Sequence, residues 1–396
     1  MRSRPVLRLL SVVSLLAGCG SGTGGSDSGG GAVNNVLPIQ VSFGPADDLV
    51  NGLYTSVTIC VPGTESCQTI DGVAVDTGSV GLRLLASRVS LPLPRMTDAS
   101  GNALANCASF ADNSYTWGPM ATADIRLAGE QAGSVPVQII GAPSFAGAPD
   151  DCSSGGTAED TVSALAANGI LGLGVFRQDC GAACTGGRMP PLYFSCPVGA
   201  PCAATAVPLA KQLQNPVWLF PQDNNGVLVS LPAIPATGAP TVAGSLIFGI
   251  GTQSNNSLGG AKVYTTDDVG NFSTVFEGQT YSSSYIDTGS NGLYFQDSDT
   301  IGLPACPDGD SDFSCPPSTL SLTATTIGHN GSSGDVAFNV ANAESLFRSN
   351  NAAFNDLGGP DTGDFDWGLP FFFGRPTFIA IEGQSTAGGT GPYWAY

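Results

Sequence analysis

The hydrophobic pattern of this chain consists of short apolar runs broken by turn-forming residues, which predicts many strands and few helices. Apolar strands are expected at residues 73–75, 121–127 and 285–286. Helical stretches are few and short, at residues 158–167, 207–214 and 341–349. The 54 Gly and 28 Pro among 396 residues supply the turns, and a hydrophobic content of 42% excludes a disordered chain. We therefore expect an all-β fold.

One segment occurs twice with the same flanking pattern. The sequence Asp-Thr-Gly-Ser-x-Gly-Leu begins at Asp76 and again at Asp287, each time entered from an apolar strand and left through another. A strand that ends in Asp and turns at Gly presents its carboxylate at a corner. Two such corners, one in each lobe, would place the carboxylates face to face, and the pair would hold one shared proton. Such a pair can activate a water molecule, because one carboxylate takes its proton while the other donates to a substrate carbonyl.

A third copy of the tripeptide serves as a control. Residues 361–363 again read Asp-Thr-Gly, but Gly and Pro precede them, Asp364 follows them, and no apolar strand flanks them. We interpret Asp361 as part of an exposed surface loop, remote from the other two aspartates.

The repeat and its surroundings resemble the pepsin-like aspartic peptidases, in a bacterial lipoprotein form. The resemblance implies a bilobal all-β fold with pseudo-two-fold lobes and an active site between them. It implies that Asp76 and Asp287 are catalytic and that Thr77 and Thr288 cross-brace the two loops. Ser79 and Ser290 would hydrogen-bond the outer carboxylate oxygens, and the supporting turns would be completed by Gly78 and Gly289.

The family also has an apolar-apolar-Gly element later in each lobe, which threads the active-site loop. Residues 169–174 fit it in the first lobe, and residues 242–251 resemble the strand that closes that lobe. In the second lobe the matching segment is Asp366-Trp367-Gly368, where Asp366 departs from the pattern because an apolar residue is usual there. The lobes are expected at residues 37–252 and 253–396.

Two further positions depend on the resemblance. Pepsin-like enzymes cover their cleft with a hairpin, the flap, that carries a tyrosine. Tyr115 is our first candidate for this flap residue and Trp117 is the second. The alternative is that the aromatic residue here is an ordinary one in a hairpin without this role. Arg83 stands where the family often has an aromatic residue. We expect Arg83 to be solvated on the far face; if it pointed into the cleft, it would pair with acidic neighbours and lower the proton affinity of the dyad.

The N-terminus has the pattern of a lipoprotein signal peptide. Residues 1–8 are basic, residues 9–17 form an apolar run too short to span a bilayer, and Leu-Ala-Gly-Cys follows. This resembles a bacterial lipobox and implies removal of residues 1–18 and a diacylglycerol on Cys19. An ordinary secretory signal is the alternative.

Residues 19–36 form a Gly/Ser-rich tether, and Gly20 is not the Asp that retains lipoproteins at the inner membrane. We expect a cell-envelope protein anchored in the outer membrane, facing the periplasm or the surface.

Ten cysteines remain besides Cys19, an even number that indicates up to five disulfides in an exported protein. Cys60 and Cys67 flank a turn and form a plausible local pair, and Cys306 and Cys315 form the next. A cluster allows three pairings, with zinc as a weaker alternative; it comprises Cys180, Cys184, Cys196 and Cys202.

Charge and composition narrow the function. With 13 Lys+Arg against 32 Asp+Glu, the chain lacks the basic face that a nucleic-acid partner requires. The single histidine, His329, lies in a turn-like stretch, and the acidic run at residues 308–312 is interpreted as a solvated loop rather than a calcium site.

We expect no metal or cofactor, since water is the nucleophile. The predicted function is that of a monomeric, membrane-tethered endopeptidase acting on peptides or proteins. The alternative is a binding lipoprotein that keeps the fold without turnover.

Overall fold

Strands joined by tight turns form most of the chain in the computed structural model. The structure describes residues 34–145, 147–186, 191–295, 303–307, 311–361 and 363–396. The predicted signal peptide, the predicted lipidation site Cys19 and nearly all of the predicted tether lie outside the described residues, as does most of the acidic run at 308–312. No helix in the described ranges combines the length and the apolar character needed to cross a membrane.

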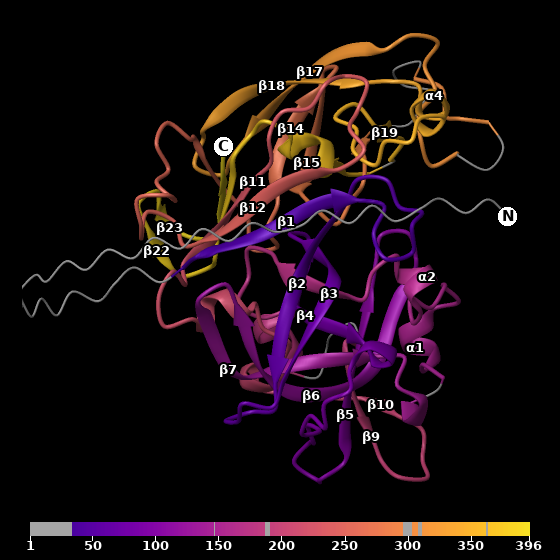
Figure 1. The fold of residues 1–396 in the computed structure, drawn as a ribbon, viewed down its shortest axis with the longest axis vertical. Helices are drawn as coiled ribbons and strands as arrows, with labels where there is room; N and C mark the ends of the chain where they lie inside the picture. Colours follow the sequence, from indigo (N-terminus) through magenta and orange to yellow (C-terminus); the bar gives the residue numbers. More distant parts are fainter. Residues whose placement is uncertain (1–33, 146, 187–190, 296–302, 308–310, 362) are drawn as a thin grey trace, which may run out of the picture. The chain divides into compact units, whose positions relative to one another are not determined.

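One antiparallel layer is built from both halves of the chain and runs between them (Figure 1). Its strands follow the order β1 (Val36–Ser42), β12 (Val242–Phe248), β11 (Gly226–Ser230), β21 (Thr377–Ala380), β24 (Tyr393–Ala395) and β13 (Val263–Thr265). In β1 every second residue is buried, at Leu37, Ile39 and Val41, as the two-residue period of a strand requires. The last strands of the chain therefore pair with strands of its first part.

The first lobe continues the same sheet from β1. Next to β1 come β2 (Gly52–Cys60), β3 (Cys67–Asp76), β8 (Gly169–Leu173), β4 (Val80–Leu85), β7 (Glu130–Ile140), β6 (Tyr115–Leu127), β5 (Ala103–Ser109), β9 (Tyr193–Cys196) and β10 (Ala203–Ala204). All of β8 is buried and it pairs in parallel with β3, which is typical of a strand covered on both faces.

The second lobe has a separate sheet of seven strands. Their order is β18 (Ser333–Val340), β17 (Leu320–Ile327), β14 (Phe272–Phe276), β15 (Gln279–Ile286), β20 (Phe365–Trp367), β16 (Leu293–Phe295) and β19 (Gly358–Gly359). Its core is aromatic: Phe295 stacks on Phe365 at 5.0 Å between ring centroids, and Phe276 meets Phe295 edge-on at 5.3 Å. A two-stranded ribbon near the C-terminus comprises β22 (Ser385–Thr386) and β23 (Gly389–Thr390).

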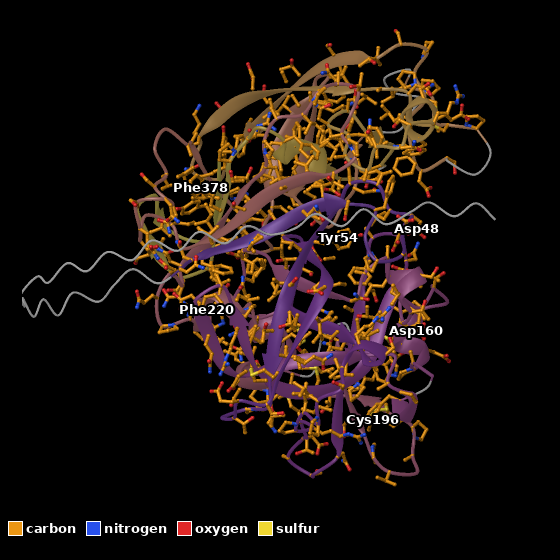
Figure 2. All side chains as sticks on the ribbon, in the orientation of Figure 1. Asp48, Tyr54, Asp160, Cys196, Phe220 and Phe378 are labelled. Carbon is orange, nitrogen blue, oxygen red and sulfur yellow. A yellow bond between two sulfur atoms is a disulfide. The ribbon has the colours of Figure 1, made fainter. Side chains whose placement is uncertain are left out.

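The main apolar core takes side chains from both lobes, and a smaller apolar cluster is separate from it. Figure 2 draws Phe220 and Phe378 on opposite sides of β1 and β12. Phe220 packs edge-on against Phe248 at 5.2 Å, in the main apolar core, whereas Phe378 belongs to a smaller cluster with Leu228 and Tyr393.

Helices in the described chain are shorter than the sequence predicts. They are α1 (Asp150–Ser153), α2 (Val162–Leu165) and α4 (Ala343–Phe347), with 3-10 turns at η1 (Ala86–Arg88), η2 (Pro143–Phe145), η3 (Gly181–Thr185), η4 (Leu209–Lys211), η5 (Pro216–Leu219) and η6 (Leu369–Phe372). The predicted helix at 207–214 is wrong, since η4 is a single turn. Its Leu213 amide donates to the Tyr193 hydroxyl at 2.6 Å instead of to a helical carbonyl.

Five disulfides join the ten cysteines considered above. The two local pairs, Cys60–Cys67 and Cys306–Cys315, are confirmed. The cluster pairs in sequence order, as Cys180–Cys184 and Cys196–Cys202, which removes the zinc alternative because no thiolate remains there. The fifth disulfide, Cys107–Cys152, joins β5 to α1.

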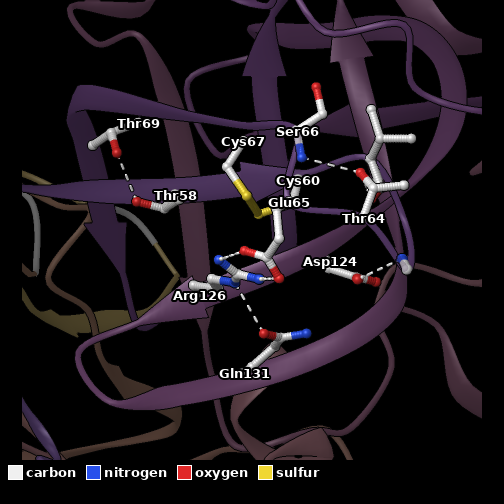
Figure 3. Close-up of a disulfide and its surroundings, with 12 residues drawn as sticks. Thr58, Cys60, Thr64, Glu65, Ser66, Cys67, Thr69, Asp124, Arg126 and Gln131 are labelled. Atoms are coloured by element: carbon white, nitrogen blue, oxygen red, sulfur yellow. Dashed lines mark hydrogen bonds and ion pairs between the residues drawn. A yellow bond between two sulfur atoms is a disulfide. The ribbon is translucent and has the colours of Figure 1, made fainter.

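Figure 3 shows the first of these disulfides at the β2–β3 turn. Beside it the Arg126 guanidinium donates to both carboxylate oxygens of Glu65 at 3.0 Å and to Gln131 at 2.9 Å. The Asp124 carboxylate accepts from the backbone amides of Gly63 and Ser134. The ion pair is exposed and stabilises little, so the disulfide and the Asp124 hydrogen bonds are what fix this turn.

Candidate active site

The two repeated segments have the same place in their lobes. In the first lobe β3 ends at Asp76, the chain turns, and it leaves as β4, while β8 passes between them, parallel to β3 and antiparallel to β4. In the second lobe β15 leads to Asp287 and the chain leaves as β16, with β20 between them in the same two orientations. The predicted apolar-apolar-Gly elements are thus β8 and β20, each threading one loop.

This topology brings the Asp76 and Asp287 carboxyls together. The backbone N–H of Gly78 donates to Oδ1 of Asp76 at 2.8 Å and to Oδ1 of Asp287 at 2.9 Å. A single amide hydrogen shared by two carboxyl oxygens places both groups within reach of one bridging water molecule.

Each carboxyl is also held from within its own loop. Asp76 accepts from the Ser79 amide at 3.1 Å and from the Ser79 hydroxyl at its outer oxygen. Asp287 accepts from the Gly289 amide at 2.7 Å and from the Ser290 hydroxyl at 2.9 Å, again at its outer oxygen. These hydrogen bonds to Ser79 and Ser290 are the ones that the family resemblance implies.

Crossed threonines join the two loops. The Thr77 hydroxyl donates to the Ile286 carbonyl at 3.0 Å and accepts from the Thr288 amide at 3.0 Å. The Thr288 hydroxyl donates to the Val75 carbonyl at 2.7 Å and accepts from the Thr77 amide at 3.1 Å. Four buried hydrogen bonds thus fix the separation and orientation of the carboxyls.

The electrostatics of the pair favour a retained proton. Burial among protein atoms, followed by the charge of Asp76 and a hydrogen bond with it, raises the pKa of Asp287 above its ordinary value. Asp76 is 8% exposed, whereas Asp287 keeps some solvent contact. Asp287 therefore keeps its proton to higher pH than a free aspartate does.

Two glycines make this approach possible. A Cβ atom on Gly78 would lie 2.7 Å from Asp287 Cγ, and one on Gly289 would lie 2.9 Å from Asp76 Oδ1. Both glycines are exposed, so the pair is open to solvent on this side. Any side chain here would force the carboxyls apart.

The third Asp-Thr-Gly copy lies apart from this network but is not the exposed loop that we expected. Asp361 is half-buried, and its carboxylate accepts from the backbone amides of Gly363 and Asp364. Its own amide donates to the Phe295 carbonyl at 3.2 Å. The expected exposure of Asp361 is therefore wrong, because β16 covers one side of the segment.

The two flap candidates differ in position. Trp117 is buried within the first lobe, edge-on to Phe194, and its indole donates to the Phe145 carbonyl at 2.9 Å, which fixes it as a core residue. Tyr115 is half-buried at the start of β6, where its backbone pairs with Thr157 and Glu159.

The expectation for Arg83 is wrong. Arg83 is 3% exposed, donates to the Val80 carbonyl at 2.8 Å, and approaches Asp179 at 3.7 Å. Asp179 also accepts from the Tyr193 hydroxyl at 2.6 Å. Burial raises the pKa of Asp179 to about 6, and the Arg83 charge partly offsets this. Arg83 thus belongs to a buried polar network inside the first lobe, and its acidic partner is not the dyad.

Sequence reasoning missed Asp179, because no local pattern marks a buried acid in a loop. It noticed Asp366 only as a departure from the family pattern. The structure places Asp366 in β20, 3% exposed and next to Ser290.

The described residues contain no group of three or more His, Cys, Asp or Glu side chains arranged to hold a metal. A cavity of about 120 Å³ lies within the second lobe, lined by apolar side chains such as Phe338 and Trp367 together with Arg375, and the dyad does not line it.

Fold and site together define a class: an all-β bilobal chain with two related aspartate loops has the pepsin-like fold. Among solved structures, the crystal structure of the aspartic proteinase from Irpex lacteus is similar, with a TM-score of 0.52 and 13% sequence identity over 91% of this chain and 96% of that one. At this identity the likeness shows the fold alone. A family model described as "Protein of unknown function (DUF3443)" matches residues 31–396, so the chain belongs to that family. No curated protein matches.

Proposed function

We propose that this protein is an aspartic endopeptidase that cleaves peptide bonds with the Asp76–Asp287 pair and an activated water molecule. The observation that carries the proposal is the Gly78 amide, which donates to a carboxyl oxygen from each lobe. Such a pair with one proton is the arrangement that peptide hydrolysis by water requires.

The chemistry follows from the surroundings of the pair. With its raised pKa, Asp287 holds the proton of the pair, and we assign Asp76 the role of general base. A water molecule between them loses a proton to Asp76 as its oxygen bonds the substrate carbonyl carbon, and Asp287 gives its proton to the carbonyl oxygen. Asp76 then gives its proton to the nitrogen of the tetrahedral diol while Asp287 takes a proton from one hydroxyl. The C–N bond breaks, a carboxylic acid and an amine leave, and Asp287 is protonated again. The crossed threonines keep both groups in position during the reaction, so little reorganisation is needed.

The proposed substrates are peptides and unfolded proteins, and the proposed active species is a monomer. Both aspartates, both serines and both threonines come from one chain, so no second copy is needed to complete the site.

We also propose that the enzyme works in the bacterial cell envelope, anchored by lipid on Cys19 to the outer membrane. Five disulfides support an oxidising compartment. Replacing Cys19 with Ser should move the protein from the membrane fraction to the soluble fraction, because the tether would have no other attachment. Unchanged fractionation of this variant would sink the lipid-anchor proposal.

The peptidase proposal is tested by digestion of an unfolded protein between acid and neutral pH. Asp76→Asn and Asp287→Asn should each lower kcat/KM by about 10³-fold or more, because neither variant can form the singly protonated pair. Asp361→Asn is the matched control, since it alters the same tripeptide outside the network, and should retain activity. Thermal unfolding should show that all three variants are folded. Turnover retained in either dyad variant would end the proposal, and a wild-type protein that binds peptides without cleaving them would favour the binding lipoprotein.

A further inference from the structure

The cavity of the second lobe has one charged residue at its wall, and that residue is basic. It has a volume of about 120 Å³ and is lined by parts of β16, β18 and β20, by Asn355 and by residues between 370 and 375. We call it the Arg375 pocket. Arg375 is the one charged residue of the described chain that lines it, although the whole chain has 32 acidic residues against 13 basic ones. A pocket with a cation and no acid favours an anion as its ligand.

The charge of Arg375 has no acidic partner among the described residues. None of the described salt bridges includes it, and its side chain is half-buried. Burial lowers the pKa of the guanidinium, and the interaction with Tyr396 has a smaller effect in the opposite direction. A partly buried charge without a counter-charge destabilises the folded chain, so a bound anion would offset a cost that is already present.

Phe371 holds the guanidinium in one position. The Cζ atom of Arg375 lies 4.2 Å from the centroid of the Phe371 ring, and its Nη1 donates to the Phe371 carbonyl. The backbone beside it is fixed as well, since the Gly374 amide donates to the Leu231 carbonyl at 3.0 Å. An arginine held in this way loses little side-chain freedom when a ligand binds.

Two nitrogens of the guanidinium remain available to a ligand. Nε and Nη2 of Arg375 have no acceptor in the described chain, where Nη1 alone is engaged. Neither is among the buried polar atoms of the described residues that lack a partner, so both are accessible. These nitrogens form one edge of the planar guanidinium, and that edge matches the two oxygens of a carboxylate.

Strand β18 adds a neutral donor. The side-chain oxygen of Asn339 accepts from the Ser321 hydroxyl at 2.9 Å, so its Nδ2 hydrogens are left without an acceptor among the described residues. Asn339 and Arg375 both line the pocket but belong to separate segments of the chain. An anion in the pocket can therefore accept from donors of two segments.

Size, charge and lining together select the ligand. Engineered apolar cavities of about 150 Å³ bind benzene, so a cavity of about 120 Å³ admits only a small molecule. One cation balances one negative charge, whereas a dianion such as sulfate would leave a second charge uncompensated in a chain whose net charge is −19. Leu293 and Trp367 form a buried cross-strand pair that gives the pocket an apolar wall, which suits a short hydrocarbon chain.

We propose that the Arg375 pocket binds a small carboxylate, which pairs with Nε and Nη2 of Arg375 and accepts from Asn339. The ligand would lie against the strand that supports one dyad loop, because the carbonyl of Trp367 accepts from the Asp287 amide at 3.1 Å. A free organic acid and the carboxyl end of a peptide offer the same chemistry. Binding requires no turnover, so this site stands or falls separately from the proposed peptidase activity.

The test is a titration of the full mature chain with propionate at constant ionic strength, followed by proton–nitrogen NMR of the tryptophan indole groups. The Trp367 resonance, identified by its loss in Trp367→Phe, should move saturably with a Kd of roughly 1 mM, the range expected for so small a ligand. Arg375→Gln should weaken binding by about tenfold or more, because the charge-assisted hydrogen bonds are lost.

A matched control and a second variant complete the design. Arg348→Gln removes an exposed arginine of the second lobe that pairs with Glu344 at 3.6 Å, and it should leave the Kd for propionate unchanged. Asn339→Ala should weaken binding by about threefold, the value of one neutral hydrogen bond, and it carries the test if Arg375→Gln does not fold.

Three further probes distinguish the sources of the carboxylate and the alternatives to it. N-acetylglycine presents the carboxyl end of a peptide, propionamide is the neutral counterpart of propionate, and sulfate is a dianion without a hydrocarbon chain. Saturation by propionate alone would assign the site to free organic acids, and saturation by N-acetylglycine alone would assign it to peptide ends; either result supports the carboxylate site. The inference is overturned if neither probe gives a saturable shift, if propionamide or sulfate binds as tightly as propionate, or if Arg375→Gln binds propionate like wild type.

Discussion

Single atoms decide the geometry of the paired carboxyls. The tripeptide marks Asp76 and Asp287 in the sequence, but only the structure shows that Gly78 carries an amide shared by both, and that its α-carbon faces Asp287. The sequence likewise shows Arg83 as an unusual residue without indicating its partner, because Asp179 lies in a distant loop. Contacts between residues far apart in the chain are set by the tertiary structure, and one sequence alone does not reveal them.

At the residue scale, Gly78→Ala should separate the dyad carboxyls, because the new methyl group would lie 2.7 Å from Asp287 Cγ. We expect a loss of kcat/KM of about 10²-fold or more, the cost of misplacing catalytic groups by about 1 Å. Gly260→Ala is the control, since a Cβ atom there meets no atom within 4 Å. Equal activities in the two variants would contradict a role for this close approach.

At the scale of elements, strands were predictable and helices were not. The strands at 73–75, 121–127 and 285–286 are confirmed as parts of β3, β6 and β15, because alternating apolar residues suffice to specify a half-buried strand. The predicted helix at 158–167 shrinks to α2, since Ala166 adopts a left-handed conformation and the Glu159 amide donates to the Tyr115 carbonyl. Local propensity cannot anticipate such competing tertiary hydrogen bonds.

The Cys107–Cys152 disulfide is the element-scale feature with the largest expected effect on stability. It closes a separation of 45 residues and ties the β5–β6 hairpin to α1, whereas Cys196–Cys202 closes only 6. On the chain-entropy estimate, the long loop contributes about 4 kcal/mol and the short one about 2 kcal/mol. Replacing both cysteines of each pair with Ala should therefore lower the free energy of unfolding more for Cys107–Cys152, as measured by denaturant titration. A larger loss for Cys196–Cys202 would contradict this ranking.

At the scale of the whole molecule, charge and buried acids favour an acidic medium. The chain has a formal net charge of −19 at pH 7, so self-repulsion grows as pH rises. Burial raises the pKa of Asp179 and of Asp356 to about 6, and it raises those of Asp287 and Asp366 as well. An acid with a raised pKa in the folded state binds protons more tightly than the unfolded chain does. Its stabilising effect is complete below about pH 4 and is lost as pH rises through its folded pKa.

The unfolding temperature should therefore be higher at pH 4.5 than at pH 7.5. Asp356→Asn should make stability depend less on pH, because Asn cannot ionise. Relative to wild type, its free energy of unfolding should gain on the order of 1 kcal/mol more at pH 7.5 than at pH 4.5. Calorimetry at the two pH values checks both statements. A protein that is more stable at pH 7.5 would show that acids with lowered pKa values, such as Asp98, dominate instead.

The crossed threonines also bear on how such a molecule can arise. Each loop completes the backbone hydrogen bonds of the other, so a single lobe with one Asp-Thr-Gly-Ser turn could build the same centre as a homodimer about a two-fold axis. In a homodimer every residue occurs twice, and both aspartates have identical surroundings. Fusion of two copies into one chain removes that constraint. The two lobes of this chain differ beside their aspartates: the first lobe pairs Arg83 with Ile170, and the second pairs Tyr294 with Asp366. Only a fused chain can hold such differences, and they allow its two carboxyls to become unequal.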